Sequence, residues 1–213
     1  MTRLILVRHG ESCANRQKIF AGNYNVDLEE RGVLQAEKTA EYIKDNFKVD
    51  KLYASDLIRA YRTGECIGKA LGLEVIPCKG IREICAGLWD GMLFEEIEEK
   101  YAESYAVWRN DVGKAQPPEG ESIVEMKSRV MTAFTKIAEE NDGKTVVCAT
   151  HATPIRIMQS VVQTGGIENM KDIPWVSNAS VSIFEYDNGK WTATMISEDS
   201  HLTGLQTHLP ANV

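Results

Sequence analysis

An arginine and a histidine follow each other at the end of the first apolar run of the chain. The run from Arg3 to Val7 is short and rich in β-branched residues, which predicts a buried strand, and Arg8 and His9 come next. In open α/β sheets, ligands gather outside the carboxyl ends of the strands. Gly10 lets the backbone approach a ligand closely, and a helix that begins after it would point N–H groups at an anion. The segment therefore indicates a site that handles phosphate.

A second histidine arrives in the same way. The apolar run from Thr145 to Thr150 predicts a strand that ends in His151, and Pro154 opens a predicted helix after it. Arg156 lies inside that helix, where a buried ion pair and a contact with substrate are both open. A lone Arg-His pair would more simply contain a structural histidine, because short patterns recur by chance. Two histidines at two strand ends favour a shared site instead.

Arg59 follows a further strand candidate. Residues 51–54 predict the strand, and residues 55–63 predict a helix with Ser55 or Asp56 as its N-cap. Arg59 then lies about one turn inside the helix, so its guanidinium can lean back toward the strand ends.

Glu83 lies in a segment without a helical or strand period. Residues 81–91 carry two glycines and predict a shaped loop, the kind of segment that often carries function. A carboxyl group there can serve as a proton donor, whereas a loop glutamate taken alone is usually solvated.

Other phosphate chemistries lack their residues. No cysteine has an arginine six positions later, as the loop of a cysteine phosphatase requires, and Cys148 has Pro154 there. The chain has no Asp-x-Asp pair and no Gly-x4-Gly-Lys-Ser/Thr loop. The four histidines, at positions 9, 151, 201 and 208, show no close spacing typical of a metal site, so we expect no metal.

Length and composition indicate a single globular domain over residues 1–213. The chain is 43% hydrophobic and 26% charged, and it is long enough to bury a sizeable core. A formal charge of −7 argues against nucleic acid and anionic membranes as partners. No apolar run approaches the length of a membrane span, and Met1 leads directly into a strand. We expect a cytoplasmic protein with five reduced cysteines.

The remaining periodicity predicts the scaffold. Residues 33–47 have the apolar spacing of an amphipathic helix, and Ser122 with Glu125 forms a capping box before a second one. Residues 181–186 and 191–196 alternate around a turn, which predicts a hairpin. These elements predict an α/β fold: a mostly parallel central sheet with helices on both faces and a C-terminal antiparallel hairpin. The edge of that hairpin is a candidate surface for a homodimer.

Taken in order, the motifs resemble the histidine phosphatase superfamily, which includes cofactor-dependent phosphoglycerate mutases and many phosphomonoesterases. The resemblance covers most of the chain. It rests on six groups of residues: Arg8-His9-Gly10-Glu11-Ser12 with Asn15, Arg16 and Gly22; Leu28 with Gly32, Gln35 and Ala36; Ser55-Asp56-Leu57 with Arg59, Ala60 and Thr63; Glu83 with Gly87, Trp89, Asp90 and Gly91; Pro118 with Gly120, Glu121 and Ser122; and His151 with Ile155 and Arg156.

The resemblance implies a covalent mechanism and a phosphoglycerate mutase-like three-layer sandwich. His9 would attack phosphorus and form a phosphohistidine, and Glu83 would protonate the leaving oxygen. The implied catalytic residues are His9, Glu83, His151, Arg8 and Arg59, and the implied phosphate-binding residues are Arg8, Asn15, Arg59, His151 and Ala152. The family commonly has two glycines after its second histidine, whereas this chain has Ala152 and Thr153.

The stretch from about 92 to 121 is expected to form a partly helical cap that selects the substrate. The mutases usually carry a longer insertion here with an arginine pair, whereas this chain has only Arg109 and Pro117-Pro118. The resemblance is therefore closer to the phosphatases, which need no cofactor and act on a small phosphorylated substrate. The alternative is a phosphoglycerate mutase primed by 2,3-bisphosphoglycerate, and a third hypothesis is a phosphate binder without turnover. We expect His201 to be structural. It lies in a tail from Ser197 to Val213, for which folding over the site and a loose arrangement are both open.

Overall fold

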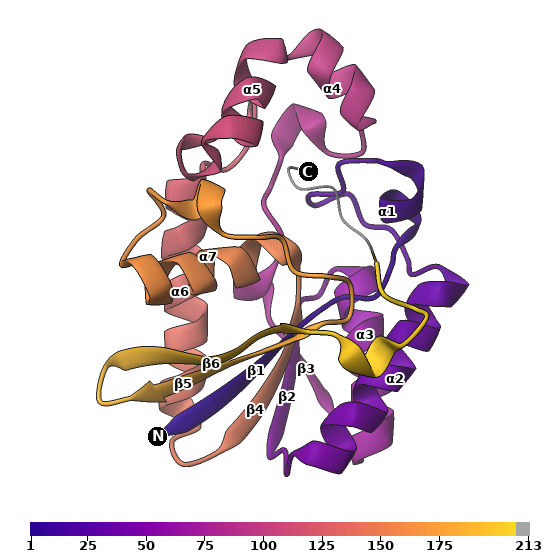
Figure 1. The fold of residues 1–213 in the computed structure, drawn as a ribbon, viewed down its shortest axis with the longest axis vertical. Coiled ribbons are helices and arrows are strands. Elements are labelled where there is room, and N and C mark those ends of the chain that lie inside the picture. Colours follow the sequence, from indigo (N-terminus) through magenta and orange to yellow (C-terminus); the bar gives the residue numbers. More distant parts are fainter. Residues whose placement is uncertain (208–213) are drawn as a thin grey trace.

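A six-stranded sheet forms the centre of the computed structural model, which describes residues 1–207 (Figure 1). The strand order is β3-β2-β4-β1-β5-β6. The strands are β1 (Thr2–Arg8), β2 (Lys51–Ala54), β3 (Val75–Pro77), β4 (Thr145–Thr150), β5 (Val181–Asp187) and β6 (Lys190–Glu198). Strands β1 to β4 run parallel to one another. Strand β5 pairs antiparallel with β1, and β6 pairs antiparallel with β5. This arrangement confirms the predicted fold class.

Helices cover both faces of the sheet, which explains why the middle of β1, Leu4 to Val7, is apolar without alternation. Leu4 and Leu6 of β1 point into a core beneath α6 (Ile123–Glu140) and α7 (Ala152–Thr164). Ile5 and Val7 point into a second core beneath α2 (Glu30–Asn46) and α3 (Ile58–Leu71). All four side chains are fully buried. A strand buried on both faces has no polar positions to alternate with.

The parallel pairing of β1 with β4 brings the two histidines together. Val7 pairs with Ala149 and Arg8 with Thr150, so His9 and His151 follow at the same sheet edge. The His9 amide continues the ladder by donating to the Thr150 carbonyl at 2.9 Å.

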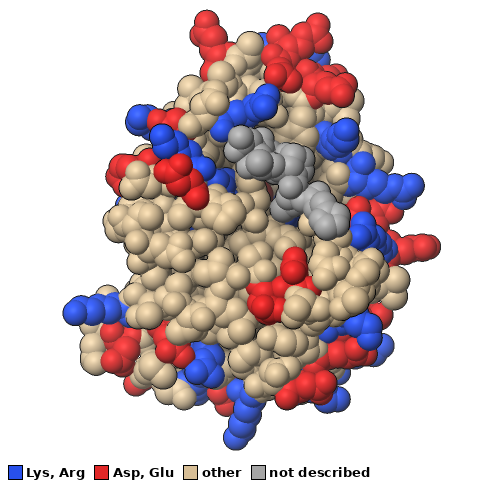
Figure 2. All heavy atoms as spheres, viewed as in Figure 1, with Lys and Arg blue, Asp and Glu red and all other residues tan. Residues whose placement is uncertain are grey.

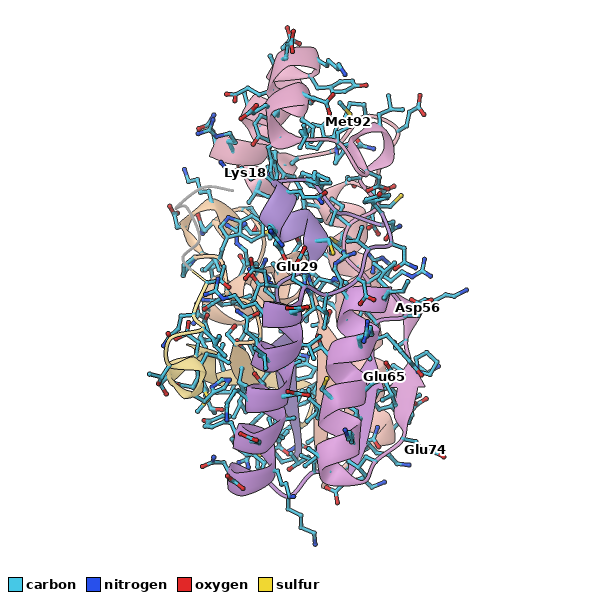
Figure 3. All side chains as sticks on the ribbon, turned by 90° about the vertical axis from the view of Figure 1, so that its right-hand side faces the viewer. Lys18, Glu29, Asp56, Glu65, Glu74 and Met92 are labelled. Carbon is cyan, nitrogen blue, oxygen red and sulfur yellow. The ribbon has the colours of Figure 1, made fainter. Side chains whose placement is uncertain are left out.

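The N-terminal ends of α2 and α3 point toward the same end of the molecule. Glu29 and Asp56, labelled in Figure 3, mark these two ends. The loop after β1 packs tightly against the start of α2. A Cβ atom added to Gly10 would lie only 2.2 Å from the Gly32 carbonyl oxygen. A side chain at either glycine would therefore separate this loop from the helix.

Beyond the carboxyl ends of the strands, α4 (Phe94–Lys100) and α5 (Ala102–Asn110) form the far end of the molecule (Figure 1). They lie within the predicted cap region. An aromatic cluster anchors them, in which the Phe20 ring makes edge contacts with Trp89, Phe94 and Trp108. Exposed glutamates of α4 lie at this end, where Figure 2 shows acidic side chains.

The segment after β1 joins this cap through backbone hydrogen bonds. It contains α1 (Cys13–Gln17), and its Phe20 amide donates to the Met92 carbonyl at 2.8 Å. The Phe94 amide donates to the Lys18 carbonyl at 3.1 Å. Figure 3 shows Lys18 and Met92 at the cap end of the molecule.

Several element boundaries differ from the predictions. Helix α3 begins at Ile58, with Leu57 as its N-cap residue, so the prediction of Ser55 or Asp56 as N-cap is wrong. Both side chains are engaged elsewhere: Ser55 contacts His151, and Asp56 accepts two hydrogen bonds of 2.6 Å from Arg82. Helix α7 begins at Ala152, which places Pro154 third in the helix rather than at its start. The three-residue edge strand β3 was not predicted.

Other local predictions are confirmed. Ser122 and Glu125 form the capping box at the start of α6, and β5 and β6 form the hairpin. Residues 81–91 form a loop that begins at the last residue of the 3-10 turn η1 (Lys79–Ile81) and contains a second such turn, η2 (Gly87–Trp89). The other short turns are η3 (Val112–Lys114), η4 (Met170–Asp172) and η5 (Ser200–Leu202). Within residues 1–207, no helix has the length and apolarity that crossing a bilayer requires.

Candidate active site

His9 lies buried at the end of β1, with the geometry of a nitrogen nucleophile. Its Nδ1 lies 2.7 Å from the carbonyl oxygen of Gly10, and a carbonyl can only accept, so Nδ1 carries the ring proton. The lone pair is therefore on Nε2, to which Arg59 Nε donates at 3.3 Å. Burial, followed by the charges of Arg59 and Arg8, holds the pKa of His9 well below 6.5. The ring is neutral at pH 7, as a nucleophile must be.

His151 faces His9 across the end of the sheet. The two ring centroids are 5.2 Å apart at an angle of 64°. His151 is fully buried, and burial and the charge of Arg59 lower its pKa well below 6.5. Its Nε2 lies 2.8 Å from Ser55 Oγ, whereas its Nδ1 is buried and has no partner among the described residues.

Three buried arginines contribute positive charge to the site: Arg8 and Arg59 act on the histidines, and all three interact with the charge of Glu83. Within the described residues none of the three forms a salt bridge. Arg8 donates to the Val176 carbonyl at 2.5 Å, and its Nε is buried without a partner. Arg59 donates to the Gly22 carbonyl at 2.7 Å and the Tyr24 carbonyl at 3.1 Å. Backbone carbonyls therefore fix these side chains and leave their charge uncompensated.

Arg156 is the third of these arginines, and the structure excludes the buried ion pair that the sequence left open. Its guanidinium donates to the Met170 and Ile173 carbonyls at 2.8–3.1 Å and lies 3.9 Å from the centre of the Trp175 ring. Carbonyl oxygens and the face of an indole ring both stabilise a cation without cancelling it.

The buried guanidinium groups set the electrostatics of the site. Burial lowers the pKa of Arg8, Arg59 and Arg156 to about 10, so all three stay protonated at pH 7. In all three arginines, the charge of Glu83 raises the pKa and so partly offsets the effect of burial. Three positive charges therefore face one glutamate and the half-buried Asp90, whose pKa burial raises. This excess suits a dianionic phosphate, because charge-assisted hydrogen bonds from arginine are strong in a buried site.

Glu83 lies at the N-terminal end of α7. One carboxylate oxygen accepts from the Ile84 amide at 2.9 Å, and the other accepts from the Thr153 amide at 3.3 Å. The loop that carries it is fixed by Arg129, which donates to the carbonyls of Gly80, Arg82 and Glu83 at 3.0–3.3 Å. Glu83 is thus partly buried and held by two backbone donors, one of them at the start of the helix that follows His151.

Asn15 lies in α1 with its amide orientation fixed by its neighbours. Its Oδ1 accepts from the Ser12 amide and hydroxyl at 3.0 and 2.9 Å and from Asn178 Nδ2 at 3.2 Å. With Oδ1 occupied in this way, the Nδ2 donor is left for another acceptor. Ala152, the other predicted phosphate-binding residue, is buried as the first residue of α7.

Asn178 and Ser55 contribute to the site in ways that the sequence did not predict. Asn178 is fully buried and also donates to the His9 carbonyl at 3.0 Å. The Ala179 amide donates to the carbonyls of Arg8 and His9 at 3.0 and 3.3 Å. The turn before β5 therefore clamps the end of β1. The only available signal was the run of small polar residues that precedes the predicted hairpin.

His201 lies away from the two facing histidines. Its ring stacks on Tyr42 at 4.6 Å, and its Nε2 lies 2.9 Å from Thr39 Oγ1. The tail continues along α2, where Gln35 donates to the Leu205 carbonyl at 2.7 Å. Predictions for the tail beyond Thr207, including His208, lie outside the described residues. In residues 1–207, no group of three or more His, Cys, Asp or Glu side chains is placed to hold a metal.

Comparison with known proteins points to one family. A model of the histidine phosphatase superfamily (branch 1) matches residues 4–199. Phosphoserine phosphatase 1 of Hydrogenobacter thermophilus is 34% identical over 203 residues, which cover 95% of this chain and 95% of that protein. The metal-independent phosphoserine phosphatase of Arabidopsis thaliana is 30% identical over 208 residues, which cover 96% of this chain and 85% of that protein.

A solved structure agrees with these matches. It is a phosphoserine phosphatase mutant from Entamoeba histolytica in complex with phosphoserine, and it is similar to this chain with a TM-score of 0.82 and 27% identity. The match covers 95% of this chain and 100% of that one. The family match, the relatives and the paired histidines agree, and the chain belongs to the histidine phosphatase superfamily, as the sequence motifs predicted.

Proposed function

We propose that this protein hydrolyses small phosphate monoesters through a phosphohistidine formed on His9. The observation that carries the proposal is a neutral imidazole whose Nε2 lone pair faces the Arg59 guanidinium, with Arg8 and Arg59 buried and, among the described residues, without a salt bridge. Positioning and charge provide most of the catalysis in phosphoryl transfer, and both are present here.

The first step joins His9 to phosphorus. The Nε2 lone pair attacks, the P–N bond forms, and the bond from phosphorus to the ester oxygen breaks. Glu83 passes a proton to the leaving oxygen. Arg8 and Arg59 hold the nonbridging oxygens, and Asn15 Nδ2 and His151 add donors.

The second step returns the enzyme to its starting state. Glu83, now a carboxylate, removes a proton from water, and the water oxygen attacks phosphorus as the P–N bond breaks. Inorganic phosphate leaves, with His9 neutral and the proton of the water transferred to Glu83. The Gly10 carbonyl keeps the His9 proton on Nδ1 throughout, so Nε2 is again ready to attack.

The cap supports water rather than a sugar-acid hydroxyl as the phosphoryl acceptor. Arg109, the only arginine of α4 and α5, lies on α5, contacts Glu98 at 3.3 Å and lies 6.0 Å from the centre of the Tyr105 ring. It is therefore engaged within the cap itself. The mutase alternative would need a second anion clamp and priming by 2,3-bisphosphoglycerate, and a phosphatase needs neither.

The substrate class is proposed from the relatives. Two of them are phosphoserine phosphatases and one structure holds phosphoserine, so phosphoserine is the first ester to test. All five cysteines are free thiols, which supports the expected cytoplasmic location. A homodimer through the outer edge of β6 and the lack of a nucleic-acid partner stay predictions.

Turnover without metal separates the alternatives. The purified protein, treated with EDTA, is incubated with a panel of phosphate monoesters that includes phosphoserine and 3-phosphoglycerate with its bisphosphate cofactor. We expect phosphate release from several esters and no isomerised phosphoglycerate. Rapid isomerisation with little phosphate release would identify a mutase, and binding of phosphate without turnover would identify a binder.

Replacing Glu83 tests its role as proton donor. Glu83→Gln cannot donate or remove the proton, so kcat/KM for phosphoserine should fall by about 10²-fold to 10⁴-fold. The loss should be smaller for p-nitrophenyl phosphate, whose leaving oxygen needs no proton, and inhibition by inorganic phosphate should persist. Glu99→Gln, at an exposed position of α4, is the matched control. Equal losses for both esters would refute the assignment.

The neutral histidines predict how stability depends on pH. His9 and His151 have lowered pKa values in the folded protein, whereas unfolded histidine titrates near pH 6.5. Below that pH the unfolded chain binds protons that the native state does not, so the free energy of unfolding falls as pH falls. Each histidine contributes up to about 1.4 kcal/mol per pH unit.

Urea unfolding between pH 7.5 and 5.5 measures this dependence. Wild-type stability should decrease over the interval, and a His9→Gln variant should show a shallower slope because one titrating group is gone. Stability that is flat or that rises toward pH 5.5 would contradict neutral buried histidines in the native state.

A further inference from the structure

We propose that Ser55 is a positioning residue that holds the ring proton of His151 on Nδ1, where a phosphoryl oxygen can accept it. The use that we assign to this proton, donation to a phosphoryl oxygen, rests on the proposed function. The hydrogen-bond geometry that carries it belongs to the protein without substrate.

Ser55 is fixed between the sheet and α3. It follows β2 directly and is fully buried, and its amide donates to the Ala149 carbonyl of β4 at 2.9 Å. Its Oγ accepts a hydrogen bond from the Leu57 amide at 3.3 Å and lies 2.8 Å from His151 Nε2. The hydroxyl therefore has two partners in the described structure, one a donor and the other a ring nitrogen.

Counting protons selects one of the two neutral tautomers. A hydroxyl has one proton to donate, and the Leu57 amide can only donate, so His151 Nε2 is the one acceptor available to Ser55 among the described residues. A proton on Nε2 would leave the hydroxyl proton without an acceptor and the buried Nδ1 lone pair without a donor. Each such buried, unsatisfied group is costly.

A proton on Nδ1 gives the Ser55 hydroxyl proton an acceptor and leaves no ring lone pair without a donor. Ser55 then donates to Nε2, and the single group left without a partner is the buried Nδ1–H of His151. A phosphoryl oxygen bound between the histidines would satisfy it. The unsatisfied atom is thus a donor kept for the ligand rather than a defect of packing.

The two histidines then take opposite roles from the same neutral tautomer. In His9 the Gly10 carbonyl occupies Nδ1–H, and the lone pair that attacks is on Nε2, which faces Arg59 Nε at 3.3 Å. In His151 the Ser55 hydroxyl occupies the Nε2 lone pair, and Nδ1–H is left to donate. A neutral imidazole has only one N–H, so the partner of its other nitrogen decides whether it attracts or repels a phosphate oxygen.

Nitrogen NMR of the free protein tests the tautomer directly. Histidine is labelled with ¹⁵N, two-bond proton-nitrogen spectra are recorded at pH 7.5, and a His151→Gln variant assigns the signals. We expect His151 to carry its proton on Nδ1 in the wild type and in Ser55→Thr, which retains the hydroxyl. In Ser55→Ala the Nε2–H tautomer should appear. A wild-type ring protonated on Nε2 would overturn the proposal, as would an unchanged tautomer in Ser55→Ala.

Binding and turnover of the same variants complete the test. Loss of a charge-assisted donor should weaken inhibition by inorganic phosphate and lower kcat/KM by about 10-fold to 100-fold in Ser55→Ala, with recovery in Ser55→Thr. Ser160→Ala is the matched control, because it removes a buried hydroxyl that donates to the Gly166 carbonyl at 2.6 Å near the other end of α7. It should leave both the tautomer and the activity unchanged.

The two readouts separate this inference from the proposed function. If wild type hydrolyses no phosphate ester but shows the expected tautomers, the proposed function fails and the role of Ser55 stands as a property of the fold. If Ser55→Ala shifts the tautomer but binds phosphate as tightly as the control, His151 does not donate through Nδ1 and the proposal fails.

Discussion

The parallel pairing of β1 with β4 is the constraint on which the rest of the site depends. It joins segments more than 130 residues apart and brings His9 and His151 to within 5.2 Å of each other, measured between ring centroids. Both strands are buried on both faces, so a shift by one residue would exchange the two cores beneath the helices. The register that packs the cores therefore also sets the distance between the histidines.

The second determinant is a set of buried positive charges that the protein leaves without a counterion. Three guanidinium groups are held by backbone carbonyls and, in one case, by the face of Trp175. A buried charge without an ionic partner is unfavourable by several kcal/mol, so the rest of the fold must stabilise this arrangement. Binding of an anion relieves the cost. Burial keeps the histidines neutral, and the charges of Arg59 and Arg8 add to its effect.

Much of this could be predicted from the sequence, for identifiable reasons. Strands β1, β2 and β4 are apolar runs with clear ends, and the capping box at Ser122 and the hairpin turn at Asn188-Gly189 are local signals. What could not be predicted depends on contacts distant in sequence. Ser55 has the residue type of an N-cap, yet its hydroxyl is used by His151, 96 positions away. Likewise, only the folded chain shows that Asn178 reaches Asn15, and that Arg156 rests on Trp175 instead of a carboxylate.

Identification of the phosphorylated atom tests the central claim most directly. The enzyme is mixed with ³²P-labelled substrate, quenched in alkali within milliseconds, and digested under conditions that preserve phosphohistidine, after which the labelled peptide is sequenced by mass spectrometry. We expect one labelled residue, His9, with phosphorus on Nε2 because Nδ1–H is held by the Gly10 carbonyl. Label on another side chain, or near-normal turnover by His9→Gln, would contradict this mechanism.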